Sequence, residues 1–220
     1  MTLDLVPIVT AIGGLGTAAS GLVDASKVFG GVNHIGFQGI RSAVRQLTDA
    51  REPANGMSQK LIVSTLESNW INGTDLGSQK ATAKSLIRLN MRPGNAAALA
   101  ELTGLDSGVL KAIASHLGAG TSLNPAESEV YARFDLIVTV LLDEAYQRSD
   151  QIYRNSTRAL AAAVAIALAL AGGYLLKINP GLSLLIGLLA TPLAPIAKDV
   201  SSALATAVNA LQIYRCPPPP

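Results

Sequence analysis

The sequence predicts an all-α membrane protein with about three transmembrane helices and a small helical soluble domain carried on a long stalk helix. Apolar residues make up 49% of the 220-residue chain and charged residues 15%, whereas soluble domains typically carry about 25% charge. The apolar excess is concentrated in residues 5–23, 159–176 and 178–197. No glycine or proline interrupts residues 126–171, a helix of roughly 70 Å and about twice the hydrocarbon thickness of a bilayer.

Residues 1–24 are predicted to form an N-terminal transmembrane helix. The nineteen residues between Asp4 and Asp24 are uncharged and just long enough to cross a bilayer, with an interfacial helix as the alternative. No basic residue precedes them, so we expect a retained segment and not a cleaved signal peptide. Gly14 and Gly16 also match the G-x-G-x-x-A spacing of a dinucleotide-binding turn. No second strand ending in an acid follows, so the helix is favoured.

Small and hydroxyl-bearing residues lie along one face of this first helix. Gly13, Thr17 and Gly21 recur every fourth residue, and Thr10 and Ser20 extend the same face. Such a face lets two membrane helices pack closely in an oligomer, or it lines water in an oligomeric pore. Packing is favoured because Thr and Ser hydroxyls can also bond to carbonyls of their own helix.

Residues 25–123 are predicted to form a helical cytoplasmic domain. The glycines of residues 27–39 indicate a turn or a short re-entrant piece. After them, apolar residues recur at helical spacing in short stretches separated by glycines, and Trp70 is expected to anchor the core of this bundle. His34 and His116 are the only histidines, and neither has a metal-ligating partner nearby in the sequence, so we expect no metal site.

One stretch of this domain has the spacing of a helix-turn-helix. Ala100, Gly104 and Leu110 would be the small residue of the first helix, the turn glycine and an apolar residue of the second helix. The second helix would begin near Asp106, which repels phosphate, and its first turns hold no Arg, Asn or Gln to read bases. A structural helical hairpin is therefore favoured. The formal net charge of +2 also gives no reason to expect nucleic acid as a partner.

Residues 124–158 are predicted to form the stalk helix. Asn124 is a good N-cap, Pro125 suits the first helical position, and Glu127 can accept a hydrogen bond from the cap amide. Arg154 and Arg158 lie one turn apart just before the uncharged run. They are predicted to mark the membrane boundary, where they can face anionic head groups.

Residues 159–197 are predicted to form a transmembrane helical hairpin, followed by an amphipathic helix and polyproline tail at 198–220. The first arm has a row of small residues that is expected to pack against another helix, namely Ala161, Ala165, Ala169 and Gly173. Asn179 and Pro180 lie in the turn that leads to the second arm. Cys216, the only cysteine, lies in the tail, where it is either acylated or a plain free thiol.

The basic residues set the expected orientation. Lys27, Arg41 and Arg45 follow the first apolar run and Arg148 precedes the second, whereas the hairpin turn holds only Lys177. The positive-inside rule therefore places the soluble domain in the cytoplasm and makes the chain a multi-pass membrane protein.

Three functions from different classes agree with this organisation. The first is a homo-oligomeric scaffold or anchor for the cytoplasmic domain, with the lipid bilayer and other copies as partners. Further protein partners would bind the domain and the C-terminal helix. The second is an oligomeric channel or pore lined by the N-terminal helix. The third, a membrane-tethered DNA-binding protein or enzyme, ranks last because the soluble part has no recognisable catalytic, cofactor-binding or metal-binding set; we expect no enzymatic activity.

Overall fold

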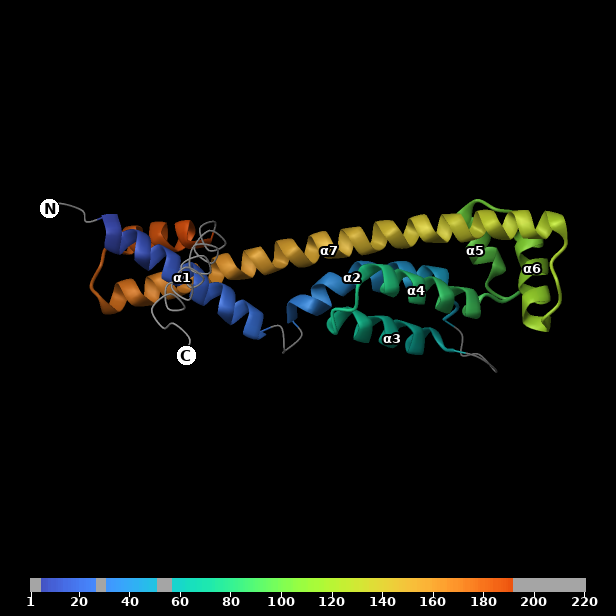
Figure 1. The fold of residues 1–220 in the computed structure, drawn as a ribbon, viewed down its shortest axis with the longest axis horizontal. Coiled ribbons are helices and arrows are strands. Elements are labelled where there is room, and N and C mark those ends of the chain that lie inside the picture. The colour runs from blue at the N-terminus through green and yellow to red at the C-terminus, as the bar shows by residue number, and fades with distance from the viewer. Residues whose placement is uncertain (1–4, 27–30, 51–56, 192–220) are drawn as a thin grey trace, which may run out of the picture. The chain divides into compact units, whose positions relative to one another are not determined.

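A computed structural model of the chain describes residues 5–26, 31–50 and 57–191, and every element in these ranges is an α-helix (Figure 1). This confirms the all-α prediction for the described residues. In chain order the helices are α1 (Leu5–Ser26), α2 (Gly31–Leu47), α3 (Gln59–Ile71), α4 (Leu76–Asn90), α5 (Ala96–Thr103), α6 (Ser107–Ala119) and α7 (Pro125–Leu175), and then a shorter helix, Pro180–Thr191. Residues 192–197 of the predicted second arm and the predicted tail at 198–220 lie outside the described residues.

The chain divides into two compact units. One, here called the helical domain, is Gly30–Arg154, and the other, here called the apolar unit, joins Met1–Phe29 with Asn155–Pro220. The boundary falls within α7, directly after Arg154 and four residues before Arg158, the last charged residue ahead of the uncharged run. Among the described residues, α7 is the one helix long and apolar enough to cross a membrane.

The start of α7 is the capping arrangement predicted from the sequence. Asn124 Oδ1 accepts a hydrogen bond from Glu127 N at 2.8 Å, and Glu127 Oε2 accepts one from Asn124 N at 3.0 Å. These bonds satisfy two amides that have no partner within the helix. The helix then continues to Leu175, close to the end predicted from the sequence.

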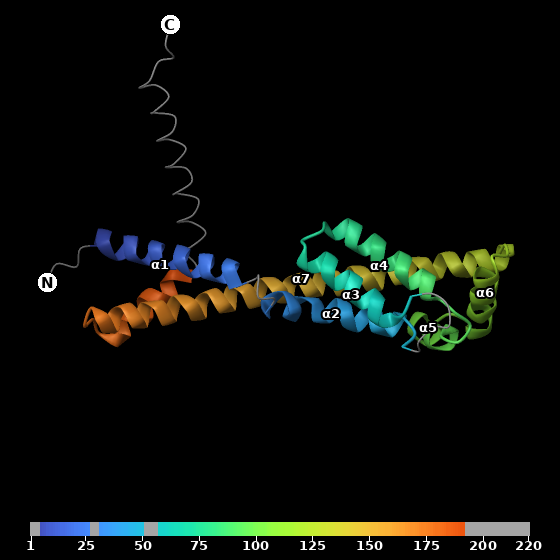
Figure 2. The same ribbon diagram turned by 90° about the horizontal axis from the view of Figure 1, so that it is seen from below.

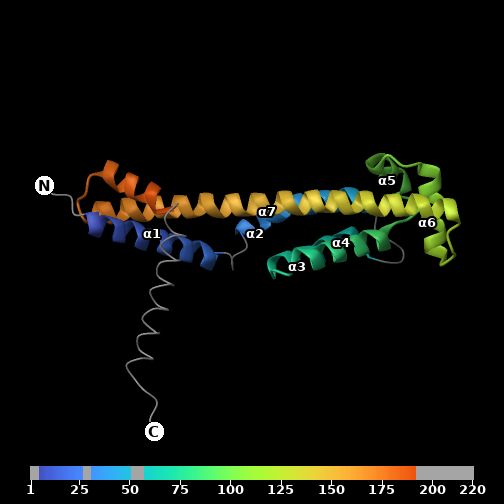
Figure 3. The same ribbon diagram turned by 45° about the horizontal axis from the view of Figure 1, so that its top comes forward.

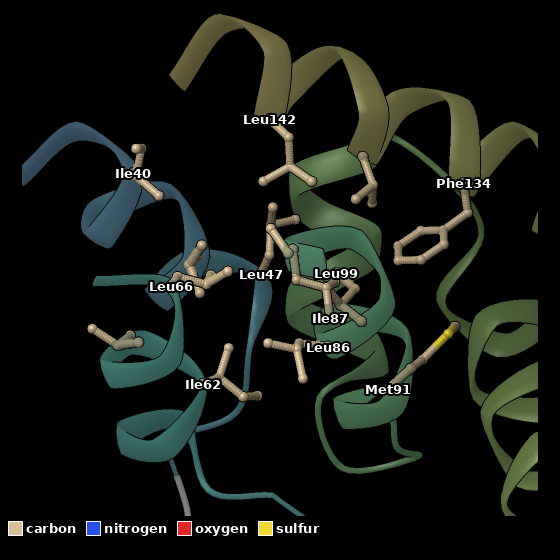
Figure 4. Close-up of a cluster of buried hydrophobic side chains, with 14 of the residues drawn as sticks. Ile40, Leu47, Ile62, Leu66, Leu86, Ile87, Met91, Leu99, Phe134 and Leu142 are labelled. Atoms are coloured by element: carbon tan, nitrogen blue, oxygen red, sulfur yellow. The ribbon is translucent and has the colours of Figure 1, made fainter. Parts of the chain in front are cut away.

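The helical domain packs α2 to α6 against the first part of α7 (Figure 4). On α7 the residues buried in this core include Phe134, Val138, Leu142 and Tyr146. α2 and α4 lie along α7 (Figure 1 and Figure 2), α3 lies on their far side (Figure 1), and α5 and α6 adjoin the amino-terminal part of α7 (Figure 3). The segment predicted as a stalk is therefore, as far as Arg154, a structural helix of the domain itself.

Residues 31–39 are helical, so the turn predicted from their glycines is wrong there; residues 27–30 of the same prediction lie outside the described residues. The glycines allow α2 to approach α7 closely. A Cβ at Gly36 would lie 2.9 Å from Tyr153 Cβ, and one at Gly39 would lie 2.6 Å from Ser149 Oγ. The hydroxyl of Ser149, which is fully buried, accepts a hydrogen bond from Ile40 N at 3.1 Å.

Basic residues of α4 pair with acidic residues of α7. Lys84 Nζ lies 2.5 Å from Asp135 Oδ2, and Arg88 Nη2 lies 2.9 Å from Asp135 Oδ1. One turn before Lys84 on α4, Lys80 Nζ lies 2.6 Å from Oδ1 of Asp143, which is about two turns after Asp135 on α7. Each partly exposed pair contributes at most about 1 kcal/mol, but together they favour one register between α4 and α7.

In the hairpin of the apolar unit, small residues are buried and large apolar residues are exposed. Ala165, Ala190 and Ser183 are buried, whereas Leu185 and Tyr174 are exposed. The turn between the two helices of the hairpin is capped by Asn179, whose Oδ1 accepts a hydrogen bond from Gly181 N at 2.8 Å. Because residues 5–9 belong to α1, they form no strand, and the dinucleotide-binding interpretation has no structural support.

Candidate interaction surfaces

The predicted contact residues of α1 are mostly on its exposed side. Ile12, Ala19 and Val23 are buried, whereas Thr10, Thr17 and Gly21 are exposed, and Gly13 and Ser20 are half-buried. The hydroxyl of Thr17 donates to the carbonyl oxygen of Gly13 at 3.0 Å, so its hydrogen-bonding capacity is partly used within the helix. The face of α1 that carries Thr10, Thr17 and Gly21 is thus exposed, and Leu22 is an exposed larger residue next to it.

The predicted small-residue row of α7 contacts the hairpin's second helix within the same chain. Ala165, Ala169 and Gly173 are buried and Ala161 is half-buried. A Cβ on Gly187 would lie 2.7 Å from Ile166 Cα and 3.1 Å from Ala169 Cβ, and one on Gly173 would overlap Ser183. The backbones of the two helices can approach this closely only because both faces carry small residues.

The two arginines predicted at the membrane boundary are both exposed. Arg154 Nε lies 2.8 Å from Asp150 Oδ2, one turn earlier on α7. The boundary between the two units falls directly after Arg154. The structure therefore places Arg154 at the end of the helical domain and Arg158 just inside the apolar unit.

Both histidines have partners that the sequence did not indicate. His34 Nδ1 lies 2.8 Å from Glu67 Oε1, which also accepts a hydrogen bond from Arg41 Nη2 at 2.7 Å. His116 Nδ1 lies 3.1 Å from Glu127 Oε2, the carboxylate that caps α7. Among the described residues there is no cluster of three or more His, Cys, Asp or Glu side chains that could hold a metal ion.

The helical domain has an open cavity of about 440 Å³ between α2, α5 and α7. Its floor includes Ala43, Leu47 and Ala145, and Glu144 and Arg148 are exposed at its edge. An apolar floor with a polar rim is typical of small contact surfaces. No local pattern in the sequence predicts this cavity, because its walls come from three helices far apart in the chain.

The helix-turn-helix spacing corresponds to α5, a turn and α6. Gly104 ends α5 with φ of 67°, the left-handed conformation that glycine adopts without strain. Asp106 Oδ1 accepts a hydrogen bond from Val109 N at 2.8 Å and so caps α6. Its carboxylate therefore lies at the helix end that would approach the DNA backbone, as expected for a structural hairpin.

Comparisons of the chain with protein families, with curated proteins and with solved structures found no match.

Proposed function

We propose that this chain is a multi-pass membrane protein that presents its helical domain in the cytoplasm as a homo-oligomeric scaffold or anchor. The proposed spans are α1, the uncharged part of α7 and the hairpin arm that begins at Pro180. The observation that carries the proposal is the reversed distribution of large and small side chains in the apolar unit.

This distribution differs between the two units. In the helical domain, large residues such as Phe37 and Leu66 form the buried core, although single large residues such as Leu89 are exposed. In the apolar unit, Leu185 and Leu188 are at least half exposed, while Ala165 and Ala190 are fully buried. Water penalises such exposure of leucine, whereas lipid does not, and close packing of small residues is how helices associate in lipid.

The proposed orientation follows from the basic residues on either side of the helical domain. Arg154 and Arg158 are exposed at the point where charge ends along α7, and positive residues accumulate on the cytoplasmic side of membranes. Oligomerisation is supported by the exposed small face of α1, because such faces allow helices of neighbouring copies to approach closely.

Membrane insertion and orientation can be tested together. The protein is expected to stay with membranes after alkaline carbonate extraction, and release into the soluble fraction would refute the proposal. In a Cys216→Ser background, a cysteine at Asn179 should react with an impermeant thiol reagent from outside the cell, whereas one at the exposed Lys111 should react only after permeabilisation. The reversed pattern would place the domain outside the cytoplasm.

The oligomer can be tested by light scattering in mild detergent. Gly13→Leu and Thr17→Leu should dissociate the wild-type oligomer, because close backbone approach on α1 would be lost. Leu22→Met, a substitution among the larger apolar residues of the same helix, is the matched control and should leave the size unchanged. A monomeric wild-type protein would contradict the oligomeric scaffold.

An oligomeric pore is the second candidate, and the exposure of Thr10 and Thr17 on α1 favours it. If these hydroxyls line water, Thr10→Asp should change conductance across a planar bilayer without dissociating the oligomer. An intact oligomer with no conductance in either form would leave the scaffold as the better account.

A further inference from the structure

A patch of exposed apolar side chains lies on the outer side of α7 within the helical domain. Leu136 and Val140 are each 66% exposed, although Val138 between them is 1% exposed. At about 100° per residue, positions two before and two after a helical residue point away from it. The patch therefore lies on the side of α7 opposite the core, and neighbouring apolar residues of this kind can contact another helix.

The charges on the two sides of this patch follow the same order along the helix, acid and then base. Glu129 and Arg133 precede it, and Glu144 and Arg148 follow it; all four are exposed. The midpoint just beyond Val138 is equally far from Arg133 and Glu144, and equally far from Glu129 and Arg148. A twofold axis through this midpoint would therefore exchange positions that carry opposite charges.

This arrangement discriminates between the two ways of pairing α7 with a copy of itself. Arg133 and Glu144 are eleven residues apart, about three helical turns, so they lie on the same side of the patch. In an antiparallel pair, Arg133 of each copy lies beside Glu144 of the other, and the Leu136 and Val140 side chains of the two copies face one another to within one residue of register. In a parallel twofold pair, the flank that carries Arg133 and Glu144 lies on opposite sides of the contact in the two copies, so the Arg133–Glu144 pairing across the contact is lost.

We propose that this face of α7, centred on Leu136 and Val140, binds a second copy of the chain in antiparallel orientation. The contact is separate from the face of α1 proposed for the oligomer. In this antiparallel contact the two α7 helices run in opposite directions. The uncharged parts of α7 therefore extend from the paired segments in opposite directions. If both apolar units are anchored as proposed above, this geometry suits a link between two bilayers.

Site-specific cross-linking of the full chain in mild detergent tests the orientation. In a Cys216→Ser background, Arg133→Cys protein and Glu144→Cys protein are treated with a short bis-maleimide, alone and mixed. The antiparallel pair predicts a cross-linked dimer in the mixture that is absent, or at least much weaker, in either protein alone. A dimer of Arg133→Cys with itself in the unmixed sample would indicate a parallel pair and overturn the proposal, as would no cross-linking in the mixture.

Charge reversal tests the contact without cysteines. Arg133→Glu or Glu144→Arg alone would each place like charges together at two symmetric positions and should raise the dimer Kd about tenfold, whereas the double reversal should restore it. Lys111→Glu, an exposed substitution on α6, is the matched control. In the cross-linking experiment above, adding Leu136→Glu to both cysteine proteins should abolish the cross-link in the mixture, and an undiminished yield would overturn the proposal. Neither measurement requires a bilayer, so failure of membrane insertion remains distinguishable from failure of this contact.

Discussion

Replacing Gly36 by alanine tests the close approach of α2 to α7. The added Cβ would lie 2.9 Å from Tyr153 Cβ and 3.0 Å from Trp70 Cζ2. Tyr153 Cβ is attached directly to the backbone of α7, so no side-chain rotation can move it away and the helices must separate. Overpacking of this kind costs about 1–3 kcal/mol, while alanine gains about 0.5–1 kcal/mol over glycine in a helix interior.

Gly118 in α6 supplies the matched control, because a Cβ there meets nothing within 4 Å. Gly118→Ala should therefore stabilise the domain by about 0.5–1 kcal/mol, and the difference between the two alanine variants isolates the steric cost at Gly36. Gly39→Ala should fall between them: the Ser149 hydroxyl can rotate away, but the bond from Ile40 N would be lost, at about 0.5–1.5 kcal/mol.

The free energy of unfolding can be measured by urea titration in mild detergent, followed by the fluorescence of Trp70. This single tryptophan packs edge-on against Tyr153, with ring centroids 6.0 Å apart, and donates from Nε1 to Asn33 O at 3.1 Å. It therefore reports on the junction that Gly36→Ala disturbs, and helical circular dichroism provides an independent probe. Equal stability of Gly36→Ala and Gly118→Ala would refute the close approach.

Three further predictions follow from buried groups and from the pairing of α7. Burial raises the pKa of Tyr146 above that of tyrosine in the unfolded chain, which is about 10. The unfolded chain therefore loses this proton first as the pH rises above about 10, and the free energy of unfolding falls by up to about 1.4 kcal/mol per pH unit. Tyr146→Phe should flatten this alkaline decline. Gly187→Leu should destabilise the hairpin by about 3 kcal/mol or more, because Ile166 Cα would lie 2.7 Å from the new Cβ, whereas the exposed Leu188→Met should leave the melting temperature in detergent unchanged. Vesicles carrying the wild-type protein should cluster in light scattering, and vesicles carrying Leu136→Glu should stay dispersed; wild-type vesicles that also stay dispersed would confine the α7 pair to a single bilayer.

Local chemistry predicted the start of α7 correctly, and long-range packing explains what was missed. Asn124, Pro125 and Glu127 are close in sequence and form the cap by themselves. Gly36, in contrast, has the same local signal whether it makes a turn or a close helix contact, and only its partner Tyr153, far away in the chain, distinguishes the two. The pairing of Glu67 with both His34 and Arg41 was missed for the same reason.

The candidate surfaces likewise include features that helical spacing predicts and features that only the fold reveals. Helical spacing alone put Ala165, Ala169 and Gly173 on one face, but the identity of the neighbouring helix required the structure. The sequence predicts a stalk helix at residues 124–158, without indicating that five short helices would cover Phe134, Val138 and Leu142. The exposed pair Leu136 and Val140 could not be recognised from the sequence, because isolated leucine and valine residues in a helix usually belong to its core.

Two different solvents, water and the proposed bilayer, would explain why one helix carries two opposite patterns. Up to Arg154, burial of large side chains such as Phe134 and Leu142 lowers the free energy in water, so charges face outward. Beyond that point, lipid would remove this driving force, and only close contact between small residues would hold helices together. An apolar residue exposed in the first half, such as Leu136, is therefore costly in water, which is the physical reason to expect a partner on that face and not on the leucine-covered surface of the second half.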